Sequence, residues 1–216
     1  MFADGALTVS AKPVIAIDAD GVLLDYGAAY PRAWQRAFGS FPRERDPNAY
    51  WPLDRWEVER LTGERLEAFR RQFDETFWSS IPAMPGAIEA TNVLHDAGFE
   101  LVCVSALDRT HEQARLRNLR ELGFPIERVI ATPHTDVGNP KAAALTELQP
   151  IAFLDDYLPY LTGLPPNIHT ALLRSHMTGS PNHGQGRDAV RSTHADLADF
   201  AKWWLQNQRP SSGHHP

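Results

Sequence analysis

Three short apolar runs, each ending in a polar or charged side chain, constrain the fold of this chain most strongly. They are residues 14–17 before Asp18, residues 101–104 before Ser105, and residues 151–154 before Asp155. Continuous apolar runs of this length are typical of strands that are buried on both faces of a parallel sheet. The polar residues then lie at the carboxyl ends of the strands, where open parallel sheets bind their ligands. The sequence therefore predicts one crevice in which these side chains meet.

Strand-like and helix-like segments alternate along the chain. The apolar patterns predict strands at 14–17, 100–104, 128–131, 151–154 and 170–173, and helices at 87–97, 109–122, 141–148 and 189–206. Such alternation calls for a parallel sheet with right-handed crossovers. We therefore expect the α/β class, with a Rossmann-like sheet between two layers of helices.

One long segment interrupts this alternation. Residues 25–81 are rich in charge and in aromatic side chains, which recur near helical spacing, and several prolines divide the segment. We expect a small helical insert at 25–81, a core made of 1–24 and 82–208, and a disordered tail at 209–216.

Composition limits the kinds of partner and location. The chain has 216 residues and a formal net charge of -6, which gives no indication of a nucleic-acid partner. Its single cysteine, Cys103, falls inside a predicted strand, where a small core residue is a better interpretation than a nucleophile. We expect no signal peptide, no membrane partner, a cytoplasmic location, and a monomer or a homodimer.

The carboxylates at the strand ends match a metal-assisted attack on phosphorus. Asp18 and Asp20 follow the first strand, and Asp155 and Asp156 follow the fourth. An aspartate can attack a phosphoryl group and form an acyl phosphate, provided that a cation offsets the repulsion between the two anions. Mg²⁺ supplies that charge and prefers oxygen ligands, here Asp18, one of the Asp155 and Asp156 pair, and the backbone carbonyl of Asp20.

Further groups complete the expected site. Lys141 adds a positive charge, and the Ser105 hydroxyl with nearby backbone N–H groups, such as that of Ala106, can bind phosphoryl oxygens. Protonated Asp20 can donate to the leaving oxygen and later activate water. Each feature alone also fits an ordinary turn, helix cap or solvated charge, so the prediction depends on their occurrence together, in this order.

At these residues the chain resembles the phosphatase branch of the haloacid dehalogenase superfamily. Residues 18–23 match the opening signature, and Ser105, Lys141 and the Asp155-Asp156 pair match the next three. The resemblance implies that Asp18 is the nucleophile, Asp20 the general acid/base and magnesium the cofactor. It also favours Asp156 over Asp155 as the direct metal ligand, and it identifies the helical insert as a cap that selects substrates.

The resemblance leaves the reaction partly open. Dehalogenating members carry a different residue at the second aspartate, so Asp20 favours phosphoryl chemistry on a small phosphate ester. A phosphomutase and a non-catalytic phosphate-binding module are the alternatives. Trp51 escapes the helical pattern of the other aromatic residues in the insert, which makes it the best candidate for contact with the substrate.

Overall fold

The computed structural model describes residues 12–133, 135 and 138–207. Its centre is a six-stranded sheet in the order β3-β2-β1-β4-β5-β6, in which every pairing is parallel. The strands are β1 (Val14–Ile17), β2 (Glu100–Ser105), β3 (Arg128–Ala131), β4 (Ala152–Asp155), β5 (His169–Leu173) and β6 (Ser192–His194). The predicted α/β class is confirmed, whereas the predicted tail at 209–216 lies outside the described residues.

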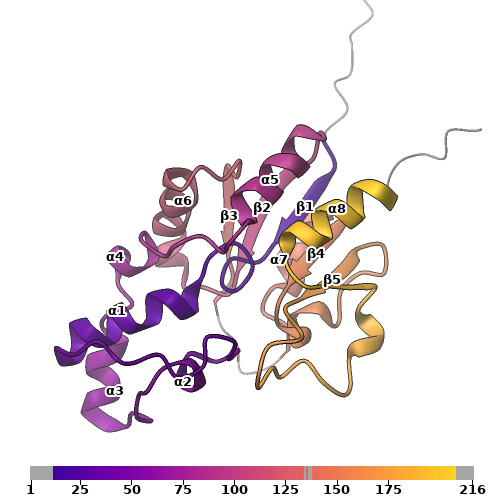
Figure 1. The fold of residues 1–216 in the computed structure, drawn as a ribbon. Helices are drawn as coiled ribbons and strands as arrows, with labels where there is room; N and C mark the ends of the chain where they lie inside the picture. The colour runs from indigo at the N-terminus through magenta and orange to yellow at the C-terminus, as the bar shows by residue number, and fades with distance from the viewer. Residues whose placement is uncertain (1–11, 134, 136–137, 208–216) are drawn as a thin grey trace, which may run out of the picture.

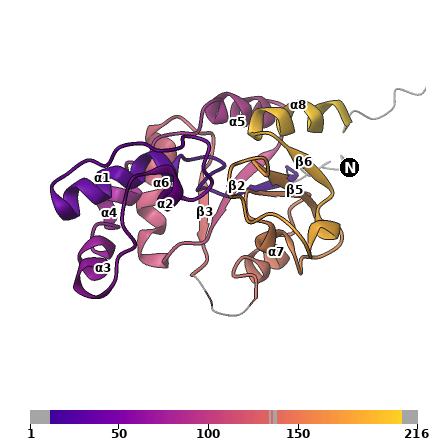
Figure 2. The same ribbon diagram turned by 60° about the horizontal axis from the view of Figure 1, so that its bottom comes forward.

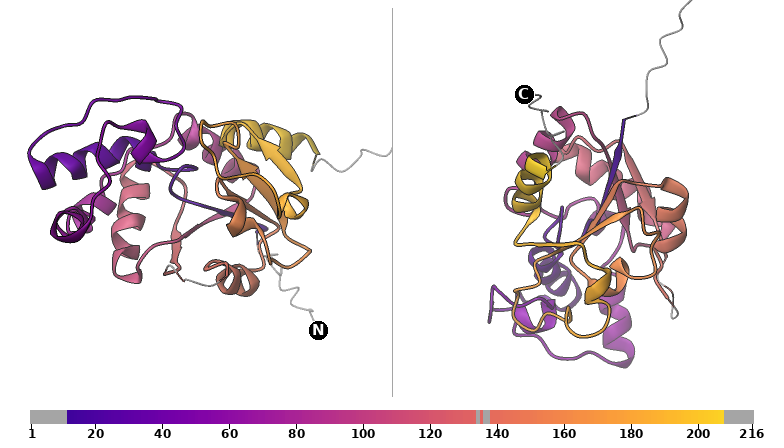
Figure 3. Two further views of the ribbon diagram at one scale, coloured as in Figure 1. Left: turned by 90° about the horizontal axis from the view of Figure 1, so that it is seen from below. Right: turned by 90° about the vertical axis from the view of Figure 1, so that its right-hand side faces the viewer.

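Helices cover both faces of the sheet, which gives three layers (Figure 1). Alternate strand residues such as Ile15 and Cys103 face α5 (Ala87–Asp96), α6 (Glu112–Glu121) and α8 (Leu197–Asn207) in one apolar cluster. The residues between them, such as Val102 and Phe153, face α7 (Ala142–Leu148) and the 3-10 turn η2 (Leu158–Leu161) in a second cluster. Figure 3 shows the two helical layers on either side of the strands. Burial on both faces explains why the strands read as unbroken apolar runs.

The predicted helix at 189–206 is wrong over residues 189–196. A 3-10 turn, η3 (Arg187–Ala189), and strand β6 precede α8, which begins at Leu197. Strand β6 is only three residues long, is polar at Ser192 and Thr193, and pairs with β5 alone at the sheet edge. An edge strand of this kind has no apolar run by which it can be recognised.

The segment between β1 and β2 contains the helices α1 (Tyr26–Phe38), α2 (Pro52–Arg55), α3 (Gly63–Arg70) and α4 (Glu75–Trp78). They lie together beside the sheet in Figure 2. Aromatic side chains hold them together, and these side chains belong to the same apolar cluster as the α5 face of the sheet. The members are Tyr26, Tyr30, Trp34, Phe69, Phe73 and Phe77.

The insert also touches the far half of the sheet through one loop. The backbone N–H of Tyr50 donates to the carbonyl of Thr178 over 2.9 Å, and the N–H of Thr178 donates to the carbonyl of Asn48 over 2.9 Å. The Tyr50 hydroxyl donates to the backbone carbonyl of Asp156 over 3.1 Å. These bonds hold the loop around Tyr50 over the carboxyl ends of β1 and β4.

No helix in the described part of the chain is both long enough and apolar enough to cross a membrane.

Candidate active site

The carboxyl ends of β1 and β4 bring three carboxylates together. The backbone N–H of Asp18 donates to the carbonyl of Leu154 over 2.9 Å, which fixes Asp18 beside the end of β4. Asp18, Asp155 and Asp156 each offer one carboxylate oxygen, and these atoms all lie within 4.8 Å of one another. Strands β1 and β4 are neighbours at the point where the strand order reverses, which is where sheets of this type bind ligands.

Lys141 lies in the same cluster and bridges two of the carboxylates. Its Nζ is 2.5 Å from Oδ1 of Asp18 and 2.6 Å from Oδ2 of Asp155, and the side chain is fully buried. Asn139 fixes the backbone at Lys141. Its Oδ1 accepts the backbone N–H of Lys141 over 2.9 Å, and its Nδ2 donates to the carbonyl of Tyr160 over 2.6 Å. The expected meeting of Lys141 with the strand-end aspartates is thus present.

One ammonium does not compensate three buried carboxylates. Burial raises the pKa of Asp18 to about 7, against the opposing effect of Lys141, and burial also raises the pKa values of Asp155 and Asp156. Burial disfavours the charge on Lys141 as well, but Asp155 and Asp18 outweigh it and raise the pKa of the ammonium. The cluster therefore carries an excess of negative charge that a divalent cation would offset. Three clustered carboxylate oxygens are the donor set that Mg²⁺ prefers.

The two members of the acidic pair have different surroundings. Both oxygens of Asp155 are engaged, one with Lys141 and the other with the backbone N–H of Tyr157 over 2.8 Å. Asp156 has Arg174 as its counter-charge, with Nη1 3.6 Å from its Oδ2. This distance is too long for a good hydrogen bond. Asp156 therefore has the freer carboxylate of the two, and is the better placed to accept a metal ion.

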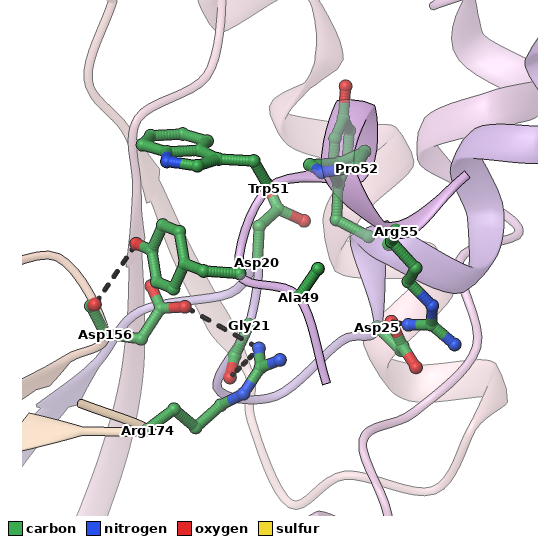
Figure 4. A pocket seen from close by; sticks show the side chains of 12 residues that line it. Asp20, Gly21, Asp25, Ala49, Trp51, Pro52, Arg55, Asp156 and Arg174 are labelled. Carbon is green, nitrogen blue, oxygen red and sulfur yellow. Dashed lines mark hydrogen bonds and ion pairs between the residues drawn. The ribbon is translucent and has the colours of Figure 1, made fainter. Parts of the chain in front are cut away.

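Gly21 lets the carboxylate of Asp156 lie against the backbone. Its φ of +88° is in the left-handed region, and a Cβ built there would lie 2.1 Å from Oδ2 of Asp156. Any side chain at this position would push Asp156 away from the cluster. Figure 4 shows Asp156, Gly21 and Arg174 in contact at one side of a cavity.

Asp20 points away from this cluster and forms a salt bridge with Arg115 of α6. Both carboxylate oxygens of Asp20 accept from the guanidinium, each over 2.8 Å, and Arg115 is fully buried. The guanidinium also lies 5.1 Å from the ring centroid of Trp78. The aspartates at 18 and 20 thus diverge as expected. Because the side chain of Asp20 is outside the group of three, any metal contact from this residue would come from its backbone carbonyl.

The end of β2 supplies the remaining predicted groups. Ser105 is buried, and its hydroxyl has no hydrogen-bond partner among the described residues. A buried unpaired hydroxyl is costly, which favours a ligand that would bind it. The next residue, Ala106, lines a cavity above the carboxylates.

Cys103 lies inside the core, where burial raises the pKa of its thiol to about 12. This favours the interpretation of Cys103 as a core residue over that of a nucleophile.

The cavity above the carboxylates has a volume of about 410 Å³. Asp18, Asp20, Asp155 and Asp156 all line it. A smaller cavity of about 200 Å³ adjoins it and shares Asp20 and Asp156 (Figure 4). Trp51 lines both cavities and is 43% exposed, so its ring is available to a ligand.

Sequence reasoning missed several residues of the site. Arg115 belongs to a helix with many charged residues, whose sequence is typical of a solvated helix. Its spacing of four from buried Leu119 nevertheless places the two residues on one face. Arg174 has a φ of +53°, a conformation rare outside glycine, which no sequence pattern reveals. Tyr50 is one of many aromatic residues at 25–81, and nothing in the sequence distinguishes it from the others.

No protein-family model matches the sequence, and no curated protein matches it. Solved structures do match the fold. A predicted phosphatase from Clostridium acetobutylicum is 14% identical, with a TM-score of 0.60 over 91% of this chain and 100% of that chain. A haloacid dehalogenase family hydrolase from Deinococcus radiodurans with bound phosphate and sodium is 17% identical, with a TM-score of 0.58 over 90% and 96% of the two chains. A dehalogenase is 16% identical, with a TM-score of 0.56 over 91% and 98%.

Proposed function

Because this chain has the fold of the haloacid dehalogenase-like hydrolases, we propose that it is a magnesium-dependent phosphatase that cleaves a small phosphate monoester through an aspartyl-phosphate. Two of the solved structures with this fold carry the names phosphatase and hydrolase, and one of them holds phosphate. The observation that carries the proposal belongs to this chain: three buried carboxylates and one lysine converge below an open cavity.

Asp18 is the nucleophile in this proposal. One of its oxygens is bound by Lys141, and the residue lines the cavity, so its other oxygen can reach a phosphoryl group there. The attack forms a bond between Asp18 and phosphorus and releases the alcohol; water then hydrolyses the acyl phosphate and restores the carboxylate. Mg²⁺ held by Asp18, Asp156 and the backbone carbonyl of Asp20 would supply the positive charge that lets two anions approach. Asp155 orients Lys141 in this arrangement.

Three groups bind the phosphoryl oxygens. The Ser105 hydroxyl is buried and unpartnered among the described residues, the backbone N–H of Ala106 follows it at the cavity wall, and Lys141 contributes a full positive charge. Donors that are already fixed in place stabilise the charge that develops in the transition state without paying for reorganisation.

Asp20 is the general acid and base. It lies two residues after the nucleophile and lines the cavity in which a leaving alcohol would lie. The two bonds from Arg115 orient the carboxylate of Asp20, and a carboxylate is the form that activates water in the second half of the reaction. To donate a proton in the first half, Asp20 must give up one of these bonds.

The insert at 25–81 acts as the cap and the remainder of the described chain as the core. The insert supplies Tyr26, Tyr50, Trp51 and Trp78 to the cavity, and its loop at Tyr50 is bonded to the core at Thr178 and Asp156. In this position the loop would limit the access of water to the carboxylates.

Hydrolysis of p-nitrophenyl phosphate tests the proposal. We expect turnover that needs Mg²⁺ and is lost in EDTA, and a loss on the order of 10³-fold or more in Asp18→Asn, since removal of a nucleophile has effects of this size. Asp96→Asn, an exposed residue at the end of α5, is the matched control and keeps its activity. Retained activity in Asp18→Asn would refute the nucleophile. An isomerised sugar phosphate would instead identify a phosphomutase, and phosphate binding without hydrolysis a binding module.

A further inference from the structure

The cavity above the carboxylates has aromatic walls. Six of its lining residues are aromatic, and they come from two sides: Tyr26, Tyr50, Trp51 and Trp78 from the insert, and Tyr157 and Tyr160 from the core. The floor below them holds the four aspartates. A ligand whose phosphoryl group reaches the floor therefore places its other end between aromatic side chains.

The two walls meet at Trp51. Its ring centroid is 4.8 Å from that of Tyr50 and 6.4 Å from that of Tyr157, and both contacts are edge to face. Neither contact covers Trp51, because in each pair only the edge of one ring touches the other ring. Trp51 remains 43% exposed. By contrast, Trp78 has Arg115 over its ring and Tyr26 stacked 6.2 Å away. Trp51 is thus the aromatic residue with the most surface to offer a ligand.

The charges around the cavity disfavour a second anionic group. No lysine or arginine side chain is among the residues that line it in the described part of the chain, whereas four aspartates are. The adjoining cavity does contain two arginines, but each has acidic partners: Arg55 pairs with Asp25 and Glu44, and Arg174 faces Asp156. Arg115, over the ring of Trp78, is paired with Asp20. Lys141, 4.8 Å from the ring centroid of Tyr160, is paired with Asp18 and Asp155. A carboxylate or second phosphate on the substrate would therefore find only paired cations near the aromatic walls.

The phenols of the walls reinforce this selection. Tyrosine and tryptophan side chains make up both walls, and the Tyr50 hydroxyl already donates to the backbone carbonyl of Asp156. The walls therefore offer neutral aromatic surface. Such surface favours flat rings, because stacking is available to every π-face. A volume of about 410 Å³ is within the range of small-molecule sites.

Taking these observations together, we propose that the substrate is a phosphate monoester whose alcohol part carries a flat, uncharged ring system and no second anionic group. The ring stacks on Trp51 between the insert wall and the core wall. This inference rests on the proposed function and specifies the substrate class of the same site. A nucleoside and a simple aryl-substituted alcohol share the recognised chemistry, and the experiment separates them.

The test compares substrates that differ in the ring and not in the leaving group. Adenosine 5′-monophosphate and ribose 5-phosphate both release a primary alcohol, as do benzyl phosphate and ethyl phosphate. We expect the ring-bearing member of each pair to have the higher kcat/KM, by about 5- to 150-fold, the range of stacking one base on one aromatic side chain. A preference confined to the first pair identifies a nucleoside; a preference in both identifies any ring. Adenosine 3′,5′-bisphosphate, with its second anion, should be the poorer nucleotide.

Two variants test the assignment of Trp51. Trp51→Leu should reduce the ratio between adenosine 5′-monophosphate and ribose 5-phosphate toward one. Phe41→Leu should leave the ratio unchanged, because Phe41 is an exposed aromatic residue of the same insert that lines neither cavity. The affinities for adenosine 5′-monophosphate and ribose 5-phosphate are also compared by calorimetry, on Asp18→Asn protein with Mg²⁺. This comparison does not depend on turnover.

The outcomes separate the two proposals. Equal kcat/KM values and equal affinities within both pairs overturn the ring preference, even if Asp18-dependent hydrolysis is present. A ring preference in binding without any turnover supports the aromatic site and overturns the phosphatase. A better rate with the bisphosphate than with the monophosphate overturns the exclusion of a second anion.

Discussion

Replacement of Lys141 by methionine tests the electrostatics of the cluster. The change keeps an unbranched apolar stem and removes the ammonium that bridges Asp18 and Asp155 at 2.5 and 2.6 Å. Three buried carboxylates then remain with Arg174 as the nearest cation, 3.6 Å from Asp156. Loss of one partner from a buried ion pair leaves an uncompensated charge, which costs about 3–5 kcal/mol of unfolding free energy.

For a domain of this size, about 1 kcal/mol corresponds to about 2–4 °C in Tm, so we expect Lys141→Met to lower Tm by about 6–20 °C. The assay is thermal unfolding in EDTA at pH 8, which is above the pKa of about 7 that Asp18 has in the native protein. Lys202→Met, at an exposed position of α8, is the control and should change Tm by no more than about 2 °C.

Added Mg²⁺ should restore more stability to Lys141→Met than to the native protein. A cation that binds only the folded state at about 100 times its Kd contributes about 2.7 kcal/mol, which is a large share of the expected deficit. A Tm loss no larger than that of Lys202→Met would refute the reasoning, because it would mean that the carboxylates do not depend on the lysine.

Three further predictions concern the same groups. Because burial raises the pKa of Asp18 above its unfolded value, the stability that this residue contributes is present below about pH 4 and is lost as the pH rises through about 7. The free energy of unfolding, measured by urea titration in EDTA, should therefore fall less over this pH range in Asp18→Asn than in the native protein. An equal fall in both proteins would contradict the assignment. Asp156→Asn should stabilise the metal-free protein and abolish its stabilisation by Mg²⁺ in thermal unfolding, whereas a retained Mg²⁺ effect would favour Asp155 as the ligand. Arg115→Met should lower the free energy of unfolding in urea by about 1–3 kcal/mol, and by less when Asp20 is already replaced by Asn. If the two substitutions have additive effects, Arg115 and Asp20 do not stabilise each other.

The central strands could be predicted from the sequence because their burial on both faces leaves an unmistakable apolar run. The predicted strand at 128–131 agrees with β3, and those at 14–17 and 170–173 agree with β1 and β5 to within one residue. Strand β6 could not be found in this way, because Ser192 and Thr193 are polar and pair with one neighbour only. The spacing of the aromatic residues predicts helices at 25–81, where α1 to α4 lie. The contact of this segment with Thr178 depends on backbone hydrogen bonds, which leave no pattern in the sequence.

The candidate site was predictable where its residues follow strands. Asp18, Ser105 and Asp155 end their strands, and parallel pairing brings such ends to one edge. Arg115 is on a helix whose other arginines face solvent, so only the packing of α6 against the sheet reveals its burial. Arg174 follows the apolar run of β5 directly, but an arginine at this position also fits an ordinary solvated strand end.

Chemical trapping of the phosphorylated protein tests the central claim most directly. Protein that is mixed with Mg²⁺ and a phosphate monoester, then quenched in acid and digested, should yield a phosphoryl group on the peptide that contains Asp18, and hydroxylamine should remove it as it does other acyl phosphates. A phosphoryl group on any other residue, or Mg²⁺-dependent hydrolysis that proceeds unchanged in Asp18→Asn, would contradict the account.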